Sequence, residues 1–268
     1  MIATARPTPA PSVVRSALHV MEHNFRLYRS RWWVSMVNNT LNPVAWLAAM
    51  GLGIGTLVDR HVGSVEGLPY LAFMAPGFLA TSAMQMGCNL ASHPIMGKVR
   101  WHDTYVSVLA TPAGVPGIML GEFGWIAVRL LQGSAIFAVV MALFGAVRSP
   151  WVIAAAPVAA LTGLAFATPI SIISSAARND LPFALIWTIV IFPMMMFGGA
   201  LFPVSQLPGA LQVLAWALPL AHGVALARAL SIGAATPSAA LLHLSVLVAY
   251  ALAGGIVSYL AMRRRLEP

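Results

Sequence analysis

Two charged residues, Glu122 and Arg129, stand seven positions apart within an apolar stretch, residues 117–147. On a helix this spacing places both on one face, about 10 Å apart along the axis. Charged groups inside such stretches line proton or substrate pathways, or pair within a helical bundle. We expect pairing within the bundle, with Glu122 near one end and partly hydrated, and with Arg129 deeper, facing protein or a cavity. Handling of a substrate or proton is the alternative.

Other reactive groups are few. His19 and His23 could share a helix face as metal ligands, but the sequence offers no third ligand, so we expect no metal site. The single lysine, Lys98, lies in "PIMGKVRW", which does not fit a phosphate-binding P-loop. The single cysteine, Cys88, excludes an internal disulfide and a paired-cysteine site. We therefore expect no catalytic residue, no cofactor and no ATP hydrolysis in this chain.

The composition predicts a membrane protein. Hydrophobic residues make up 59% of the 268 residues and charged residues only 8%, against about 25% charged residues in soluble domains. Several runs provide the roughly 20 apolar residues that a spanning helix needs. The alternation of barrel strands is absent, so the spans must be helices. The net charge of +8 comes mainly from residues at the ends of these runs, which indicates membrane orientation and not nucleic-acid binding.

Six transmembrane helices are expected in a single membrane domain, residues 34–268. They cover residues 34–58, 68–91, 117–147, 151–177, 181–202 and 238–262. Outside these spans, eleven Lys and Arg residues lie on the side of the N-terminus, and three, Arg60, Arg148 and Arg228, lie on the other side. Because basic residues gather on the cytoplasmic side, both termini are expected there.

Residues 1–33 are expected to form a cytoplasmic tail and an interfacial helix. Apolar residues recur every three or four positions, while basic residues fall on other faces. The apolar residues are Val14, Leu18, Met21, Phe25, Tyr28 and Trp32. This pattern is typical of an amphipathic helix that lies on membrane lipids.

Residues 203–232 fit neither an external loop nor a seventh span. The stretch is apolar but is interrupted by Pro203, Pro208, Gly209 and Pro219. A seventh span would place the arginines at 263–265 outside, against the charge rule. We expect a re-entrant hairpin of two half-helices, about 207–217 and 220–232, broken at Pro219 and packed on the outer span ends.

The same stretch, "FGGALFPVSQLPGALQVLAWALPLAHGVALARAL", resembles the signature of the type-2 ABC exporter permeases. The matching positions are Gly198, Gly199, Phe202, Pro203, Leu207, Pro208, Pro219, His222 and Arg228. The segments "PGFLATSAMQ", "LGEFGW" and "ALTGLAFA" are similar to the lipo-oligosaccharide exporters of that family, so the resemblance covers most of the chain.

The resemblance implies a permease subunit that moves an amphiphilic cargo, such as a lipo-oligosaccharide, outward across the bacterial cytoplasmic (inner) membrane. Such permeases pair as dimers, here as an expected homodimer, and dock cytoplasmic ATPase subunits that bind ATP and Mg²⁺. A short helix at about 99–110 would then be the coupling helix, with four residues near the ATPase. These residues are Arg100, Trp101, Asp103 and Tyr105. The prolines of the hairpin would form an outer gate.

Three alternatives stay open on the sequence alone. A drug or antibiotic efflux permease of the same family carries the same signature. A self-sufficient secondary carrier would need no ATPase and would use intramembrane charges such as Glu122 and Arg129. A membrane-embedded enzyme is disfavoured, because the spans hold no cluster of His, Asp or Ser residues that could form a catalytic set.

Overall fold

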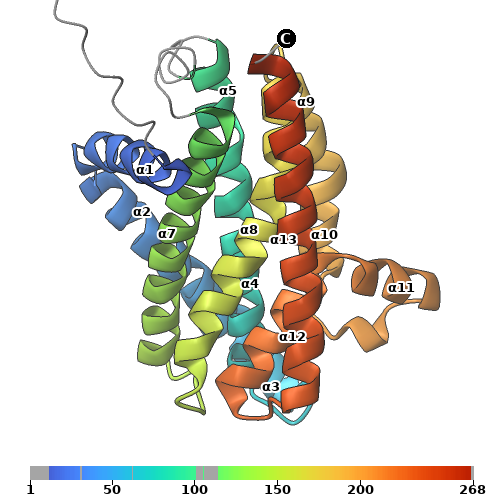
Figure 1. Ribbon diagram of the computed structural model, residues 1–268. Helices are drawn as coiled ribbons and strands as arrows, with labels where there is room; N and C mark the ends of the chain where they lie inside the picture. Colours follow the sequence, from blue (N-terminus) through green and yellow to red (C-terminus); the bar gives the residue numbers. More distant parts are fainter. Residues whose placement is uncertain (1–11, 31, 62, 101–104, 106–113, 267–268) are drawn as a thin grey trace, which may run out of the picture.

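The computed structural model describes residues 12–30, 32–61, 63–100, 105 and 114–266. In this part of the chain the secondary structure is helical, apart from one isolated β-bridge between Val65 and Leu68. Most helices run side by side as a bundle, while α1 crosses one end and α11 projects sideways (Figure 1). The predicted all-helical class is confirmed.

The helices follow the predicted apolar runs. In chain order they are α1 (Val13–Arg29), α2 (Trp32–Leu47), η1 (Ala48–Gly55), α3 (Thr56–His61), α4 (Tyr70–Ala91), α5 (His93–Arg100), α7 (Gly114–Leu143), α8 (Val152–Ala176), α9 (Leu181–Ile186), η2 (Trp187–Ile191), α10 (Phe192–Phe197), η3 (Val204–Gln206), α11 (Gly209–Ala217), α12 (Pro219–Ile232) and α13 (Pro237–Leu266). Segments η1 and η2 are π-helical turns inside longer helices, and η3 is a 3₁₀ turn.

Among the described residues, four helices are long and apolar enough to cross a membrane. They are Trp32–His61, α7, α8 and α13. Helices α11 and α12 meet at an angle of 85°, and they make a fifth candidate span only if the two together form one broken span. The 22-residue α4 and the apolar helix Leu181–Phe197 occupy the positions of predicted spans two and five. The protein is therefore a multi-pass membrane protein, and the count of six spans stays a prediction.

Two predicted spans run four and five residues past the ends of their helices, and glycine explains both. Predicted span five extends to residue 202, but its helix ends at Phe197. Gly199 there has φ +84°, a left-handed conformation that ends helices. Predicted span three extends to residue 147, but α7 ends at Leu143, shortly before Gly145 with φ +70°.

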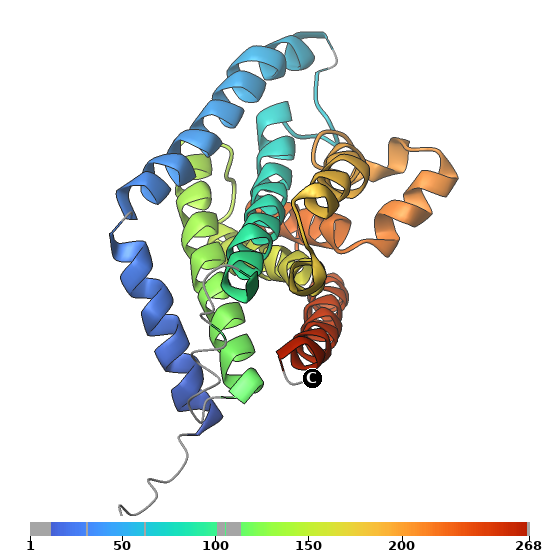
Figure 2. The ribbon, with the colours of Figure 1, turned by 90° about the horizontal axis from the view of Figure 1, so that it is seen from above.

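Helix α8 lies at the centre of the bundle and packs against α4, α7, α12 and α13, as the end-on view of Figure 2 shows. Small residues permit these contacts. A Cβ atom added to Gly163 would lie 2.5 Å from the carbonyl oxygen of Ala83 on α4. One added to Gly223 on α12 would lie 2.2 Å from the Thr162 hydroxyl oxygen. Close backbone approach through small residues is typical of helices that associate in membranes.

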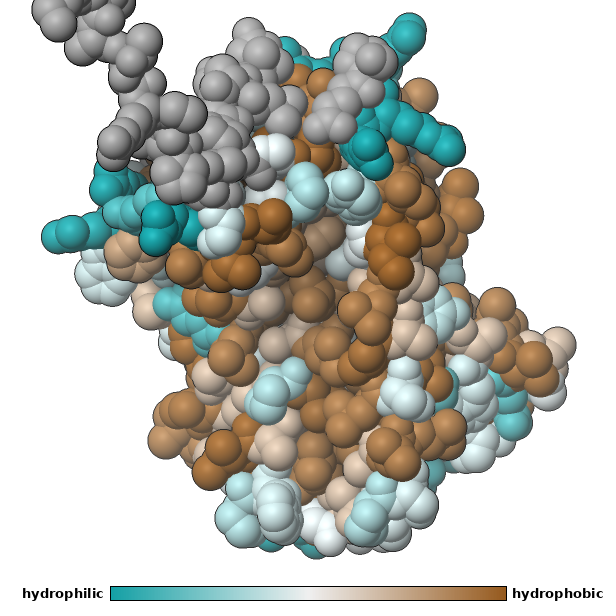
Figure 3. All heavy atoms as spheres, viewed as in Figure 1, coloured by the Kyte–Doolittle hydropathy of each residue, from teal (hydrophilic) through white to brown (hydrophobic). Residues whose placement is uncertain are grey.

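The face of the bundle seen in Figure 3 is apolar between two more hydrophilic ends. On α13, Leu241, Leu252 and Ile256 are each at least 60% exposed, as lipid-facing side chains are expected to be. Arginines 263–265 fall in the last turn of α13, at the same end of the bundle as α1 (Figure 1).

Candidate functional site

The signature stretch forms the turn after α10 and the two helices that follow it. Pro208 precedes α11, and Pro219 is the first residue of α12. At these positions the missing N–H of proline costs no helical hydrogen bond. The sharp bend between the two helices lies at Leu218, whose backbone is extended. The prolines therefore start helical segments here and do not interrupt them.

Arg228 on α12 ties this region to the bundle. Its Nε donates a hydrogen bond to the carbonyl oxygen of Phe73 at 2.9 Å, and Nη2 donates to that of Gly199 at 2.6 Å. The guanidinium also stacks on the Phe73 ring, 3.8 Å from its centroid. Arg228, which lies in the second half-helix of the predicted hairpin, is thus partly buried between α4 and the turn after α10.

Four of the nine signature residues line one cavity of about 280 Å³: Gly198, Gly199, Pro203 and Arg228. Leu207 is buried outside this cavity, and Phe202 contacts the ring of Phe197 edge-on at 6.4 Å. The signature therefore combines residues that shape one cavity with residues that position the helices around it.

His222 joins three helices. Its Nε2 donates a hydrogen bond to the carbonyl oxygen of Trp216 on α11 at 2.9 Å, which leaves Nδ1 of the neutral ring as an acceptor. Nδ1 of His243 on α13 lies 2.9 Å from this Nδ1 atom of His222, and the His243 ring stacks on the ring of Trp216. Sequence reasoning identified His222 but missed Trp216 and His243. A histidine within the apolar residues of the last predicted span was the available signal.

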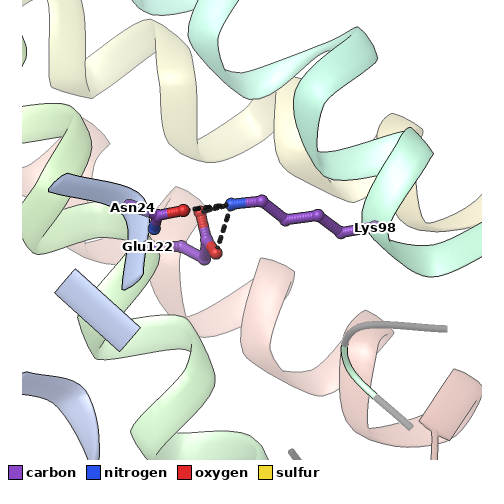
Figure 4. A network of polar contacts seen from close by, with 3 residues as sticks. All are labelled: Asn24, Lys98 and Glu122. Atoms are coloured by element: carbon purple, nitrogen blue, oxygen red, sulfur yellow. Dashed lines mark hydrogen bonds and ion pairs between the residues drawn. The ribbon is translucent and has the colours of Figure 1, made fainter. Parts of the chain in front are cut away.

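A second polar cluster lies near the end of the bundle where α1 is located. Lys98 on α5 donates hydrogen bonds to both carboxylate oxygens of Glu122 on α7, at 2.6 and 2.8 Å (Figure 4). It also donates to the side-chain oxygen of Asn24 on α1 at 2.7 Å. The expectation that Glu122 is partly hydrated is wrong, since only 4% of this residue is exposed.

The four predicted coupling residues can be placed only in part. Arg100 ends α5 and is half-buried, whereas Trp101 and Asp103 lie outside the described residues, as does most of the predicted helix 99–110. Tyr105 is buried, and this burial, followed by the negative charge of nearby Glu122, raises its pKa well above the ordinary value. The described part of this loop contains α5, His93–Arg100, which overlaps the predicted helix only at residues 99 and 100, so the coupling helix stays a prediction.

Helix α1 packs on α7 through a row of glycines that sequence reasoning did not use. Cβ atoms added to Gly117 and Gly121 would lie 2.7 Å from Cβ of Ser16 and 2.6 Å from Cβ of Val20. The predicted apolar stripe of α1 is divided, because Val14 and Phe25 are more than half exposed whereas Tyr28 packs against α7. The exposed part of the stripe is free to contact lipid.

Arg129 lies in the middle of α7. Its guanidinium stacks on the ring of Tyr28 of α1, 3.9 Å from the centroid, and the Tyr28 hydroxyl donates a hydrogen bond to Gln132. Arg129 is only 6% exposed, and it lines a cavity of about 250 Å³ that is bordered by α2, α4 and α7. The sequence contains a signal for this cavity, the "NNTLN" of residues 38–42, because asparagines are rare within apolar spans.

Comparison with known proteins places this arrangement in a family. Residues 17–231, from α1 through nearly all of α12, match the family model described as "ABC-2 type transporter". The chain belongs to this family. The match confirms the resemblance seen in the sequence and makes the chain a membrane permease, which is not itself catalytic.

Individual relatives extend the match over nearly the whole chain. Nodulation protein J of Rhizobium meliloti (strain 1021) is 34% identical over 93% of each chain. Nodulation protein J of Sinorhizobium fredii (strain NBRC 101917 / NGR234) is 35% identical over 92% of each, and that of Neorhizobium galegae is 34% identical over 96% of each. The residues that match the family model include Lys98, Glu122, Arg129 and all but the last residue of α12.

Proposed function

We propose that this chain is the membrane subunit of an ATP-driven exporter that moves a lipid-linked saccharide outward across the bacterial cytoplasmic membrane. The family match over residues 17–231 carries this proposal. The chain contains no P-loop, so ATP and Mg²⁺ would be bound by a separate cytoplasmic ATPase subunit.

The proposed topology has six crossings, and the pair α11 and α12 is re-entrant from outside. The crossings are Trp32–His61, α4, α7, α8, Leu181–Phe197 and α13. An even number agrees with α1 and the end of α13 lying at the same end of the bundle (Figure 1). Arginines gather at that end, which supports a cytoplasmic location for it.

A second copy of the chain would complete the transport path, which we assign mainly to α2, α4 and α10. Apolar side chains on α2 and α9–α10 face outward in the single chain: Trp33, Leu41, Leu185, Ile189 and Phe192 are each at least half exposed. A homodimer related by a two-fold axis could bury these faces, as is usual for membrane subunits of closed symmetry.

An apolar cavity supports an amphiphilic cargo. It has a volume of about 280 Å³ and lies between α10 and the hairpin. Its lining includes Val190, Met194, Phe197, Leu214 and Leu218. Such a lining suits an acyl chain better than a small ion, since it offers hydrophobic contact and few polar partners.

Energy transfer would begin at the loop that contains Arg100 and Tyr105. Closure of the ATPase pair on ATP would press on this loop and on α5. Lys98 connects α5 to α7 and α1 through Glu122 and Asn24, so a shift of α5 would move both helices. This is a rigid-body gating step and involves no covalent chemistry in the permease.

Transport in inverted membrane vesicles tests the proposal. Vesicles that contain the chain and its ATPase subunit should accumulate a fluorescent N-acyl oligosaccharide when ATP is added. An ATPase variant that cannot hydrolyse ATP should abolish this uptake. Uptake that needs no ATPase and is stopped by a proton ionophore would instead establish a secondary carrier. Uptake restricted to hydrophobic drugs would establish drug efflux and overturn the saccharide assignment.

A further inference from the structure

The cavity beside Arg129 combines apolar walls with a group of polar side chains, although it lies in the apolar middle of the bundle. Three neighbouring helices border it, α2, α4 and α7, which lie side by side in Figure 2. Its polar lining includes Asn38, Asn39 and Asn42 of α2, Gln85 and Asn89 of α4, and Arg129 of α7. Arg129 is the sixteenth residue of the 30-residue α7, which places this charge roughly halfway along the helix.

Several polar atoms around this cavity are buried without a partner. They are Nε and Nη1 of Arg129, Nδ2 of Asn39 and Oγ of Ser134. An unpaired buried donor is unfavourable, and more so when it is charged. Three of the four atoms can only donate hydrogen bonds, so what they lack is an acceptor.

No carboxylate in the described part of the chain pairs with Arg129. Glu122, on the same face of α7, is already bound by Lys98 through both of its oxygens. The Tyr28 ring holds the guanidinium in place through a cation–π contact, which fixes its orientation but leaves its N–H groups free to bind a ligand. The cavity thus presents a positive charge with unpaired donors, which suits an anion rich in acceptors.

We propose that this cavity binds an anionic oxygen group, such as a phosphate or carboxylate, on the saccharide head of the cargo. This inference rests on the proposed function. A guanidinium presents a planar fork that matches such groups, and the surrounding amides can bond sugar hydroxyls. A volume of about 250 Å³ is small for a whole ligand and suits one sugar-sized head group. The acyl chain would lie elsewhere, against apolar surface.

Binding in neutral-lipid nanodiscs tests the site in the complete permease–ATPase complex. The probe is a fluorescent N-acyl disaccharide with one sugar phosphate, compared with the same molecule without phosphate. The wild type should bind the phosphorylated probe roughly ten- to a hundredfold more tightly, as expected for charge-assisted hydrogen bonds. Arg129→Met should remove this preference, Arg129→Lys should retain part of it, and Arg148→Met, at an exposed arginine, should leave it unchanged.

Folding is controlled by a second variant, Asn39→Ala. Because the removed Nδ2 has no hydrogen-bond partner, this protein should keep its thermal stability and still bind the phosphorylated probe several-fold more weakly. Equal affinity of the wild type for both probes, or a preference that survives Arg129→Met, would overturn the inference. If phosphatidylglycerol displaced the fluorescent probe at the same concentration as the unlabelled probe does, the site would be assigned to a membrane lipid. That result would also overturn the inference.

The two proposals fail separately. If ATP drives uptake of the probes but Arg129 has no effect on the preference for phosphate, the exporter proposal holds and the head-group site is rejected. Phosphate preference that depends on Arg129, without any ATP-driven uptake, would leave the binding site standing and remove the exporter.

Discussion

Lys98 and Glu122 form a buried ion pair between α5 and α7, with the Lys98 ammonium 2.6 and 2.8 Å from the two carboxylate oxygens. The side chains are only 16% and 5% exposed. Asn24 brings α1 into the same contact. This is the single lysine of the chain, and it connects the loop expected to meet the ATPase with the helix expected to lie on the membrane.

Removal of one partner from this pair should destabilise the protein strongly, because the other charge stays buried. We expect Lys98→Met or Glu122→Gln to lower the free energy of unfolding by about 3–5 kcal/mol. The double variant with both changes should lose less free energy of unfolding than the two single variants lose together. Chemical denaturation of the purified protein in detergent measures these values.

The exposed pair of Glu22 and Arg26 provides the matched control. Its atoms are also 2.6 Å apart, but the side chains are 52% and 75% exposed. Glu22→Gln should therefore change stability by less than about 1 kcal/mol. If Lys98→Met cost no more than this control, the buried pair would not hold the three helices together.

Arg228→Met should loosen the turn after α10. The change removes hydrogen bonds to the carbonyl oxygens of Phe73 and Gly199, each worth about 1.5–3 kcal/mol when the donor is charged. Arg228→Lys keeps the charge but cannot reproduce the fork, so it should recover only part of the loss. Thermal unfolding ranks the stabilities of the wild type, Arg228→Lys and Arg228→Met, and Arg148→Met, at an exposed arginine, is the control. Equal effects at positions 228 and 148 would contradict the role given to Arg228.

Gly163→Ala should disrupt the contact between α4 and α8. The added Cβ atom would lie 2.5 Å from the Ala83 carbonyl oxygen and 2.7 Å from the Leu130 side chain. Overpacking of this kind costs about 1–3 kcal/mol. Gly53→Ala is the control, because no atom lies within 4 Å of its added Cβ and alanine favours helix. The midpoint of thermal unfolding should fall for Gly163→Ala and stay level or rise for Gly53→Ala.

The positions of the helices could be predicted because hydrocarbon solvation imposes a length and a composition on every span. The apolar runs gave α4, α7, α8 and α13 to within a few residues at most ends. The break between α11 and α12 could also be predicted, since proline restricts where a helix can start. By contrast, the helix end at Phe197 depends on the backbone conformation of Gly199, which composition does not specify.

The site residues were predicted unevenly for the same reason. Arg228 and His222 stand out in the sequence because they are polar in an apolar stretch, but their partners Gly199 and Trp216 act through backbone carbonyl groups. Every residue has such a group, so no pattern of side chains marks the ones that are used. Lys98 could not be paired with Glu122 without knowing how the loop between them folds back.

His222→Ala should free α11 from the rest of the hairpin. The Trp216 carbonyl loses its donor, and a hydrogen bond of this type contributes about 1 kcal/mol. Backbone amides near the bend at Leu218 should then exchange with deuterium roughly five times faster, measured by mass spectrometry. His23→Ala, at an exposed residue of α1, should leave this exchange unchanged. Unaltered exchange in His222→Ala would show that Trp216 is held by packing alone.

Labelling of single cysteines should separate six crossings from seven. Cys88 is the single cysteine of the chain, so Cys88→Ser leaves a background without a thiol. Gln206 and Arg264 are both exposed; Gln206 precedes α11 and α12, and Arg264 lies in the last turn of α13, the last crossing. With a re-entrant hairpin, Gln206→Cys should react with an impermeant maleimide on intact spheroplasts, and Arg264→Cys should react only after permeabilisation. If α11 and α12 formed one further span, Arg264→Cys would be labelled on intact cells as well. Protection of Gln206→Cys on intact cells would place the hairpin on the cytoplasmic side and remove it from the outer gate.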